Sequence, residues 1–183
     1  LKIGVSSTLC KYMLLPYLKE FIHRNPHISI SIECQSTNET LKLLDDDKID
    51  IGLIGKPASL KTFNFYYLDN IEDIFVTTKD YLRNLSARGV KKSEILQNST
   101  LMLLDKGNMT RKYIDDYLQE NQIHVKDSID ISNMDLLIDF AKIGVGVACV
   151  IKSIVSKELA EGTLIEIPLG IPIHKREVGF AYK

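Results

Sequence analysis

The sequence has no excess of charge of either sign. Its 183 residues carry Lys+Arg 23 against Asp+Glu 24, which gives a formal net charge of -1. A chain with this balance has no broad basic face that could hold a polyphosphate backbone. We therefore expect the chain itself not to bind nucleic acid.

Cysteines are few and show no pairing pattern. Cys10, Cys34 and Cys149 are far apart, and no CxxC motif is present. An odd number of scattered cysteines is typical of a reducing compartment, so we expect a cytoplasmic protein. Cys10 and Cys34 follow the first two expected strands closely enough to meet in space. A structural role is the main interpretation of these two thiols, and a redox-sensing role is the alternative.

Membrane, secretion and catalytic signals are absent as well. No apolar run reaches the roughly 20 residues that span a bilayer, and no basic-apolar leader opens the chain. The chain begins at Leu1 within an expected strand, which indicates a fragment of a longer protein. No nucleophile, base and orienting group stand out, so we expect no enzyme activity and no cofactor. His23 and His27 are separated by the helix-breaking Asn25-Pro26, so we expect no metal site there.

The sequence does contain a regular alternation of strands and helices. With 45% hydrophobic residues, the chain can bury the core of one domain or of two small ones. The first elements are a strand at 1–5, a helix over about 6–24 with a kink at Pro16, an edge strand at 28–32, a helix opened by Ser36 and a buried strand at 49–55. This order is typical of a doubly wound parallel unit, because parallel neighbours need helical crossovers.

The same architecture begins again in the second half, after expected strands near 65–68 and 74–77. It comprises a strand at 100–104, a helix at 109–120, a strand at 128–131, a helix at 134–143 and a strand at 145–150. A helix at 152–160 and strands at 164–167 and 177–182 complete the chain. Gly144 ends a helix before a strand, the reverse of the order in a phosphate-binding loop. We expect it to be a left-handed glycine at the helix terminus.

Polar loops follow the strands of both units, at the positions where α/β proteins bind ligands. Helix N-termini at these positions carry free N–H groups and partial positive charge, which suit a small anion. For each Ser or Thr, a simple helix-capping role is the alternative. Arg111 would pair with a ligand carboxylate or be solvated, and the sequence leaves both open. The candidate effector-binding residues are Ser6, Ser7, Thr8, Ser36, Thr37, Asn38, Asp105, Gly107, Asn108, Thr110, Arg111, Ser132 and Asn133.

Three stretches carry a resemblance to a known family. They are LKIGVSSTLCKYMLLPYLKEFIHRNPHISISI, LLDDDKIDIGLIG and IDFAKIGVGVACVIKSIVSKELAEGTLIEIPL. In this order and at these separations they resemble the effector-binding domain of LysR-type bacterial transcription regulators. The resemblance implies an α/β fold of two Rossmann-like subdomains joined by two crossover strands, similar to type 2 periplasmic binding proteins.

The resemblance also implies domain limits, a ligand and partners. The first subdomain would take residues 1–77 and 153–183, and the second 78–152, with a small, anionic effector in the cleft between them. An N-terminal winged helix-turn-helix, absent from this chain, would bind DNA, and the protein would form a homodimer or homotetramer. The alternative function is the extracytoplasmic solute-binding protein of a transporter, which has the same architecture.

Overall fold

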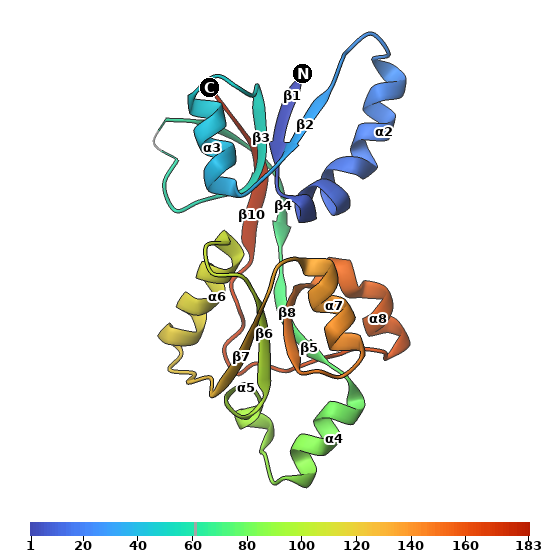
Figure 1. Cartoon of the computed structure of the whole chain (residues 1–183), viewed down its shortest axis with the longest axis vertical. Helices are drawn as coiled ribbons and strands as arrows, with labels where there is room; N and C mark the ends of the chain where they lie inside the picture. Colours follow the sequence, from blue (N-terminus) through green and yellow to red (C-terminus); the bar gives the residue numbers. More distant parts are fainter. Residues whose placement is uncertain (61) are drawn as a thin grey trace. The chain divides into compact units, whose positions relative to one another are not determined.

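Strands and helices alternate along the chain and build two separate units. The computed structural model describes residues 1–60 and 62–183 (Figure 1). Unit 1 consists of Leu1–Ile71 and Arg176–Lys183, and unit 2 of Glu72–Lys175. Each unit has its own sheet of five strands. The expected α/β fold with two subdomains is therefore confirmed.

The unit boundaries differ from those expected from the resemblance. Residues 72–77 and 153–175, which were expected in the first subdomain, belong to unit 2. The reason is strand pairing: β5 (Asp73–Thr77) pairs with β8 (Val147–Ile151) and with β9 (Ile165–Glu166) in the second sheet. The chain therefore passes from one unit to the other after Ile71 and after Lys175.

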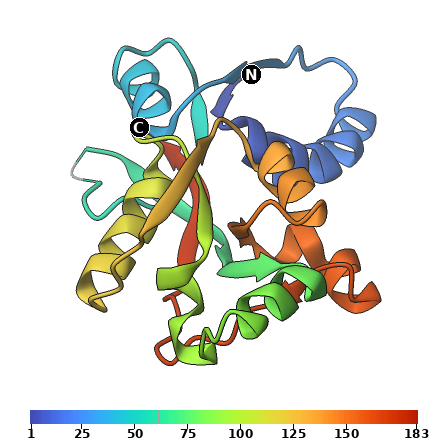
Figure 2. The ribbon, with the colours of Figure 1, turned by 60° about the horizontal axis from the view of Figure 1, so that its bottom comes forward.

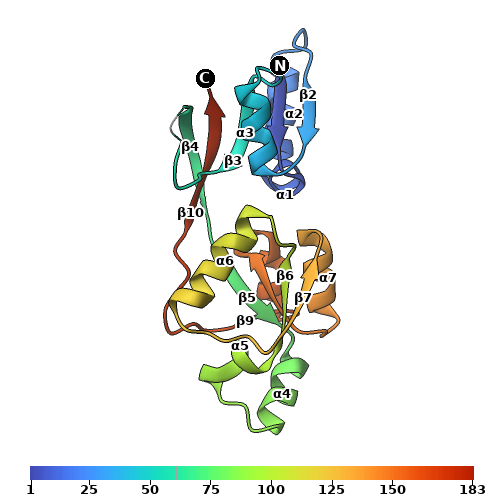
Figure 3. The same cartoon turned by 60° about the vertical axis from the view of Figure 1, so that its left-hand side comes forward.

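The sheet of unit 1 has the order β2-β1-β3-β10-β4. Its strands are β1 (Lys2–Val5), β2 (Ser31–Cys34), β3 (Ile51–Gly55), β4 (Asn64–Ile71) and β10 (Arg176–Tyr182). The first three are parallel, and β10 runs antiparallel to both β3 and β4 (Figure 3). The helices α2 (Leu15–Arg24) and α3 (Thr37–Asp45) lie on opposite sides of this sheet (Figure 1).

The helix expected over residues 6–24 is interrupted. It consists of α1 (Ser7–Leu9), a π-helical turn at Cys10–Leu14 and then α2. Pro16 has no N–H to donate to the preceding turn, so a widened turn just before it satisfies the backbone at low cost. Leu9, Leu14 and Leu18 are buried as expected, whereas Ile22 is 47% exposed.

The strand expected at 28–32 is shifted toward the C-terminus. β2 begins at Ser31, because it pairs with β1 and the pairing register starts at Lys2 with Ser31. As expected it is an edge strand. Its alternating isoleucines do not form a buried face, however, since Ile28 is 43% exposed and Ile32 only half-buried.

The sheet of unit 2 has the order β7-β6-β8-β5-β9. Its remaining elements are α4 (Lys79–Ala87), a 3-10 turn at Lys92–Glu94, α5 (Ile95–Asn98), β6 (Thr100–Leu104), α6 (Met109–Glu120), β7 (Asp127–Ile131), α7 (Met134–Lys142), a 3-10 turn at Lys152–Val155 and α8 (Ser156–Glu161). The helices α6 (yellow) and α7 (orange) flank the parallel strands (Figures 1 and 2). The core gathers around Phe75, Leu101, Leu103 and Ile114. Neither α4 nor α5 was predicted.

The glycines before β8 have the structural role expected for them. Gly144 follows α7 with a positive φ of 79°, a conformation that favours glycine. Gly146 lies against β6, and a Cβ there would overlap the Thr100 carbonyl. The two glycines therefore allow the chain to turn and then to approach β6 closely.

Candidate functional site

The polar loops of unit 1 start from neighbouring points of the sheet. Val5 at the end of β1 is the register partner of Cys34 at the end of β2. The Gln35 N–H donates to the Val5 carbonyl at 3.0 Å, which extends the pairing by one residue. The segments 6–8 and 35–38 therefore emerge side by side at the carboxyl edge of the parallel strands.

Two of the candidate hydroxyls in these loops are helix caps. The Ser6 Oγ accepts a hydrogen bond from the Leu9 N–H at 3.3 Å. Ser36 forms a capping box: its Oγ accepts from the Glu39 N–H at 3.3 Å, and a Glu39 carboxylate oxygen accepts from the Ser36 N–H at 3.3 Å. The same carboxylate oxygen accepts from the Ser36 hydroxyl at 3.0 Å. For Ser6 and Ser36 the capping interpretation is therefore confirmed.

Four other candidate side chains in these loops differ from the two caps in their hydrogen bonding. Within the described ranges 1–60 and 62–183, the side chains of Ser7, Thr8, Thr37 and Asn38 have no hydrogen-bond partner in the protein. Ser7 and Asn38 are exposed, and Thr8 and Thr37 are half-buried. Each can therefore donate to or accept from a bound molecule without breaking an existing contact.

Gln35 lies in this region but was not predicted as an effector-binding residue. In the described part of the chain, its Nε2 is buried and has no hydrogen-bond partner. It lies 3.5 Å from where a Cβ on Gly4 would be, so the amide lies close to Gly4 of β1. A buried donor without a partner is uncommon and costs free energy. Its position directly after β2, beside three polar candidates, was the signal available in the sequence.

The candidate residues of unit 2 follow β6 and β7 in the same way. Asn108 caps α6 by accepting from the Thr110 N–H at 2.8 Å, and Asn133 caps α7 by accepting from the Leu136 N–H at 2.9 Å. Gly107 has a positive φ of 101°, which a glycine allows. Asp105 and Ser132 are exposed at the two strand ends. The parallel pairing of β6 with β7 places the two loops at one edge of the second sheet.

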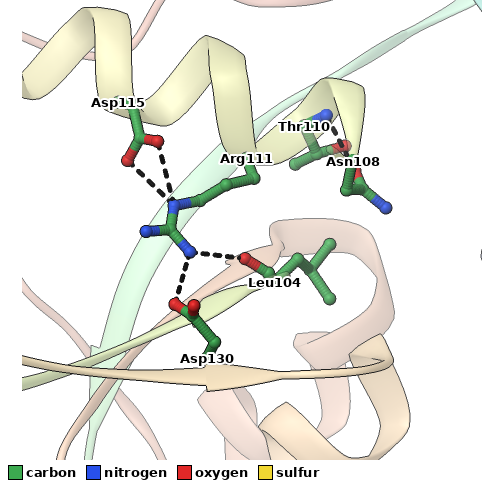
Figure 4. Close-up of polar contacts among 6 residues, drawn as sticks. All are labelled: Leu104, Asn108, Thr110, Arg111, Asp115 and Asp130. Carbon is green, nitrogen blue, oxygen red and sulfur yellow. Dashed lines mark hydrogen bonds and ion pairs between the residues drawn. The ribbon is translucent and has the colours of Figure 1, made fainter. Parts of the chain in front are cut away.

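Arg111 differs from the other candidates because its side chain is directed into unit 2 (Figure 4). It is only 6% exposed, so it is not solvated. Its Nε donates to both carboxylate oxygens of Asp115, at 2.9 and 3.0 Å. Its Nη1 donates to the Leu104 carbonyl at 2.8 Å and to Asp130 at 2.6 Å.

These contacts decide the electrostatics around Arg111. Burial lowers the pKa of its guanidinium, but the hydrogen bonds to Asp130 and Asp115 outweigh burial and raise it. The guanidinium is therefore a permanent cation matched with two carboxylates, and the local charge is negative. Such a group stabilises the contact of α6 with β6 and β7, and it offers little attraction to a ligand carboxylate.

In residues 1–60 and 62–183, His, Cys, Asp and Glu do not gather in groups of three or more that could hold a metal ion. Every helix in the same ranges is too short or too polar to cross a bilayer.

The comparison with protein families decides what kind of domain this is. The LysR substrate binding domain model matches residues 1–183, the whole chain. The chain belongs to this family. It is thus the effector-binding regulatory domain of a LysR-type transcription regulator, a family of non-enzymatic domains.

Individual relatives agree with this assignment. The chain is 23% identical over 173 residues to the uncharacterized HTH-type transcriptional regulator YeiE of Escherichia coli K12, which covers 94% of this chain and 58% of that protein. It therefore spans little more than half the length of this curated relative.

Solved structures of LysR-type regulatory domains share the fold. The regulatory domain of Synechocystis CcmR in complex with 2-PG has a TM-score of 0.81 at 18% identity, covering 99% of this chain and 86% of that one. A sulfate-bound OxyR2 regulatory domain from Vibrio vulnificus has a TM-score of 0.79 at 14% identity, covering 100% and 86%. At these identities the likeness establishes the fold alone.

Proposed function

We propose that the chain senses a small anion, which binds at the carboxyl-edge loops of unit 1. The observation that carries the proposal is the pair of hydroxyls of Ser7 and Thr37. Both lie beyond the ends of neighbouring parallel strands, and neither has a partner among the described residues. The loops start helices, so their N–H groups and the partial positive charge of α3 add to the attraction for an anion.

The remaining candidate residues have different roles in this proposal. Thr8, Asn38 and the buried amide of Gln35 supply further donors beside Ser7 and Thr37. Ser6, Ser36, Asn108 and Asn133 shape the loops as helix caps. Asp105, Gly107, Thr110 and Ser132 are the candidates of unit 2. We assign Arg111 a structural role, since two carboxylates already match its charge.

In the whole protein, we propose, this domain controls transcription. Ligand binding would shift an equilibrium between arrangements of a cytoplasmic homodimer or homotetramer, whose DNA contacts come from an N-terminal winged helix-turn-helix. The family match favours this regulator over the solute-binding protein of a transporter. The near-neutral charge of the chain also fits a sensor whose DNA contacts lie elsewhere.

Thermal unfolding of the chain tests the sensing proposal. The probes are sulfate, 2-PG, small mono- and dicarboxylates, amino acids and aromatic acids, each over a range of concentrations. A ligand at 100 times its Kd adds about 2.7 kcal/mol to the free energy of unfolding, which raises Tm by on the order of 5 °C. We expect such a rise with at least one of these anions.

Two double variants identify the residues that are responsible. Ser7→Ala with Thr37→Ala should abolish the rise in Tm while leaving the ligand-free Tm nearly unchanged. The matched control, Ser86→Ala with Ser93→Ala, removes two exposed hydroxyls of unit 2 that lie away from the strand ends. It should respond like the parent chain. A full response in the Ser7/Thr37 variant would contradict the proposed site.

A further inference from the structure

Cys10 and Cys34 come together at the edge of the sheet that carries the unit 1 loops. Cys34 ends β2 beside Val5 in the pairing register. Cys10 lies one helical turn beyond β1, with its N–H donating to the Ser6 carbonyl at 2.8 Å. The two thiols are close enough for a side-chain hydrogen bond. Both are free cysteines, 24 residues apart in the sequence, and strand pairing makes them neighbours in space.

The two thiols differ in their access to solvent. Cys34 is exposed, whereas Cys10 is partly buried. Burial, and then the charge and hydrogen bond of Cys34, raise the pKa of the Cys10 thiol, so Cys10 stays protonated at neutral pH. An oxidant from solvent therefore meets Cys34 first, with a protonated thiol in contact behind it.

We propose that Cys10 and Cys34 form a reversible, peroxide-driven disulfide that joins the start of the first helix to the end of β2. The chemistry takes two steps. The Cys34 thiolate attacks a peroxide, the O–O bond breaks, and Cys34 becomes a sulfenic acid while the other oxygen leaves as water or an alcohol. The Cys10 sulfur then attacks the Cys34 sulfur, the S–O bond breaks, and the Cys10 proton leaves with the hydroxide as water.

The local backbone suits such a bond. Cys10 opens the π-helical turn Cys10–Leu14, and Cys34 is the last residue of an edge strand. A wide helical turn and a strand end adjust more readily than a regular helix or a central strand. In a reducing compartment the bond would form only while an oxidant is present, as expected of a sensor and not of a structural disulfide.

The disulfide would affect the loops that we propose bind the anion. Cys10 lies three residues after Ser7, and Cys34 three residues before Thr37. A covalent link would fix the spacing of the two loops and so change the response to the anion. This consequence rests on the proposed function, whereas disulfide formation does not.

Mass spectrometry of the peroxide-treated chain tests the proposal without any ligand. The free-thiol count of the denatured chain should fall from the three cysteines of the sequence to a single thiol. The intact mass should drop by two hydrogens, and digestion should yield a peptide that links Cys10 to Cys34. Dithiothreitol should restore all thiols. Three intact thiols, a link between two chains, or a sulfinic acid on Cys34 as the main product would overturn the proposal.

Single variants separate the roles of the two residues. Cys10→Ser, or Cys10→Ala if the serine perturbs folding, should trap the sulfenic acid of Cys34 as a dimedone adduct. Cys34→Ser should yield little adduct on Cys10. The matched control is Cys149→Ala, which removes a thiol buried in the unit 2 core, and it should form the same link as the parent chain. Equal labelling of Cys10 and Cys34 in the two serine variants would overturn the assigned order of attack.

Discussion

At the scale of single residues, Arg111 connects three elements of unit 2. It starts on α6 and donates to Asp115 on the same helix, to the Leu104 carbonyl on β6 and to Asp130 on β7 (Figure 4). The guanidinium is buried, while both carboxylates remain more than 40% exposed. Because both carboxylates are partly exposed, solvent weakens each ion pair. Removing them would still be destabilising, since a buried charge without a partner is costly.

Replacing Arg111 should destabilise unit 2. Arg111→Ala leaves two carboxylates near each other and a buried carbonyl without a donor, which should cost about 2 kcal/mol in the free energy of unfolding. Urea unfolding followed by circular dichroism measures this cost as a lower midpoint. Arg83→Ala is the matched control, because the Arg83–Asp80 pair is exposed by 67% and 86%. It should cost less than about 0.5 kcal/mol. Equal costs for the two variants would contradict the structural role of Arg111.

At the scale of elements, the N-terminus of α3 separates a capping residue from a free one. Ser36 and Glu39 form the capping box, while the next residue, Thr37, has no side-chain partner in the described ranges. The two neighbouring hydroxyls are therefore expected to have different functions, one in stability and the other in binding.

Two single variants should reveal this difference without any ligand. Ser36→Ala removes the capping hydroxyl and should lower the free energy of unfolding by about 1 kcal/mol. Thr37→Ala should change it by less than about 0.5 kcal/mol, since no hydrogen bond is lost. Chemical unfolding of both variants under the same conditions provides the comparison. If Thr37→Ala proved the more costly variant, the assignment of the cap would be wrong.

The helices and strands also differ in how well their bounds can be predicted from the sequence alone. The bounds of α6, 109–120, match the prediction, because its capping Asn108 and its apolar spacing are local signals. The start of β2 was misplaced, since it depends on where β1 begins, a partner about 30 residues away. The π-helical turn and α4 were missed. The start of α4 is fixed partly by its capping Thr78 and partly by a hydrogen bond that the Thr100 N–H on β6 donates to the Tyr81 hydroxyl.

The candidate site was predictable to a similar extent. Strand ends followed by Ser, Thr and Asn locate the polar loops, because the carboxyl edge of parallel strands follows from topology. Whether a hydroxyl caps a helix depends on its exact position at the helix start. Ser36 is the capping residue of α3, whereas Thr37, one residue later, is not. The burial of Arg111 on α6 depends on Asp130, which is 19 residues away on β7. Local patterns carry no signal for such a contact.

At the scale of the whole molecule, the two units differ in whether one continuous segment of the chain builds them. All five strands of the second sheet lie within the continuous segment 72–175. Unit 1, in contrast, needs the C-terminal residues 176–183, because β10 is inserted between β3 and β4. Val178 and Ala181 on β10 are fully buried, so this strand also fills part of the unit 1 core.

Fragments of the chain should therefore behave differently. A fragment of residues 72–175 should fold alone, with a cooperative urea transition and dispersed amide resonances. A fragment of residues 1–71 should not fold alone, because without β10 its sheet loses the strand that joins β4 to β3 and exposes apolar residues of the core.

Adding a peptide of residues 176–183 should restore structure to the 1–71 fragment, since the peptide supplies the missing strand. A variant peptide with Ala181→Asp should fail to do so, because it would bury a charge. Cooperative folding of 1–71 without the peptide would show that β10 is dispensable, and unit 1 would then have to be redefined as the N-terminal segment alone.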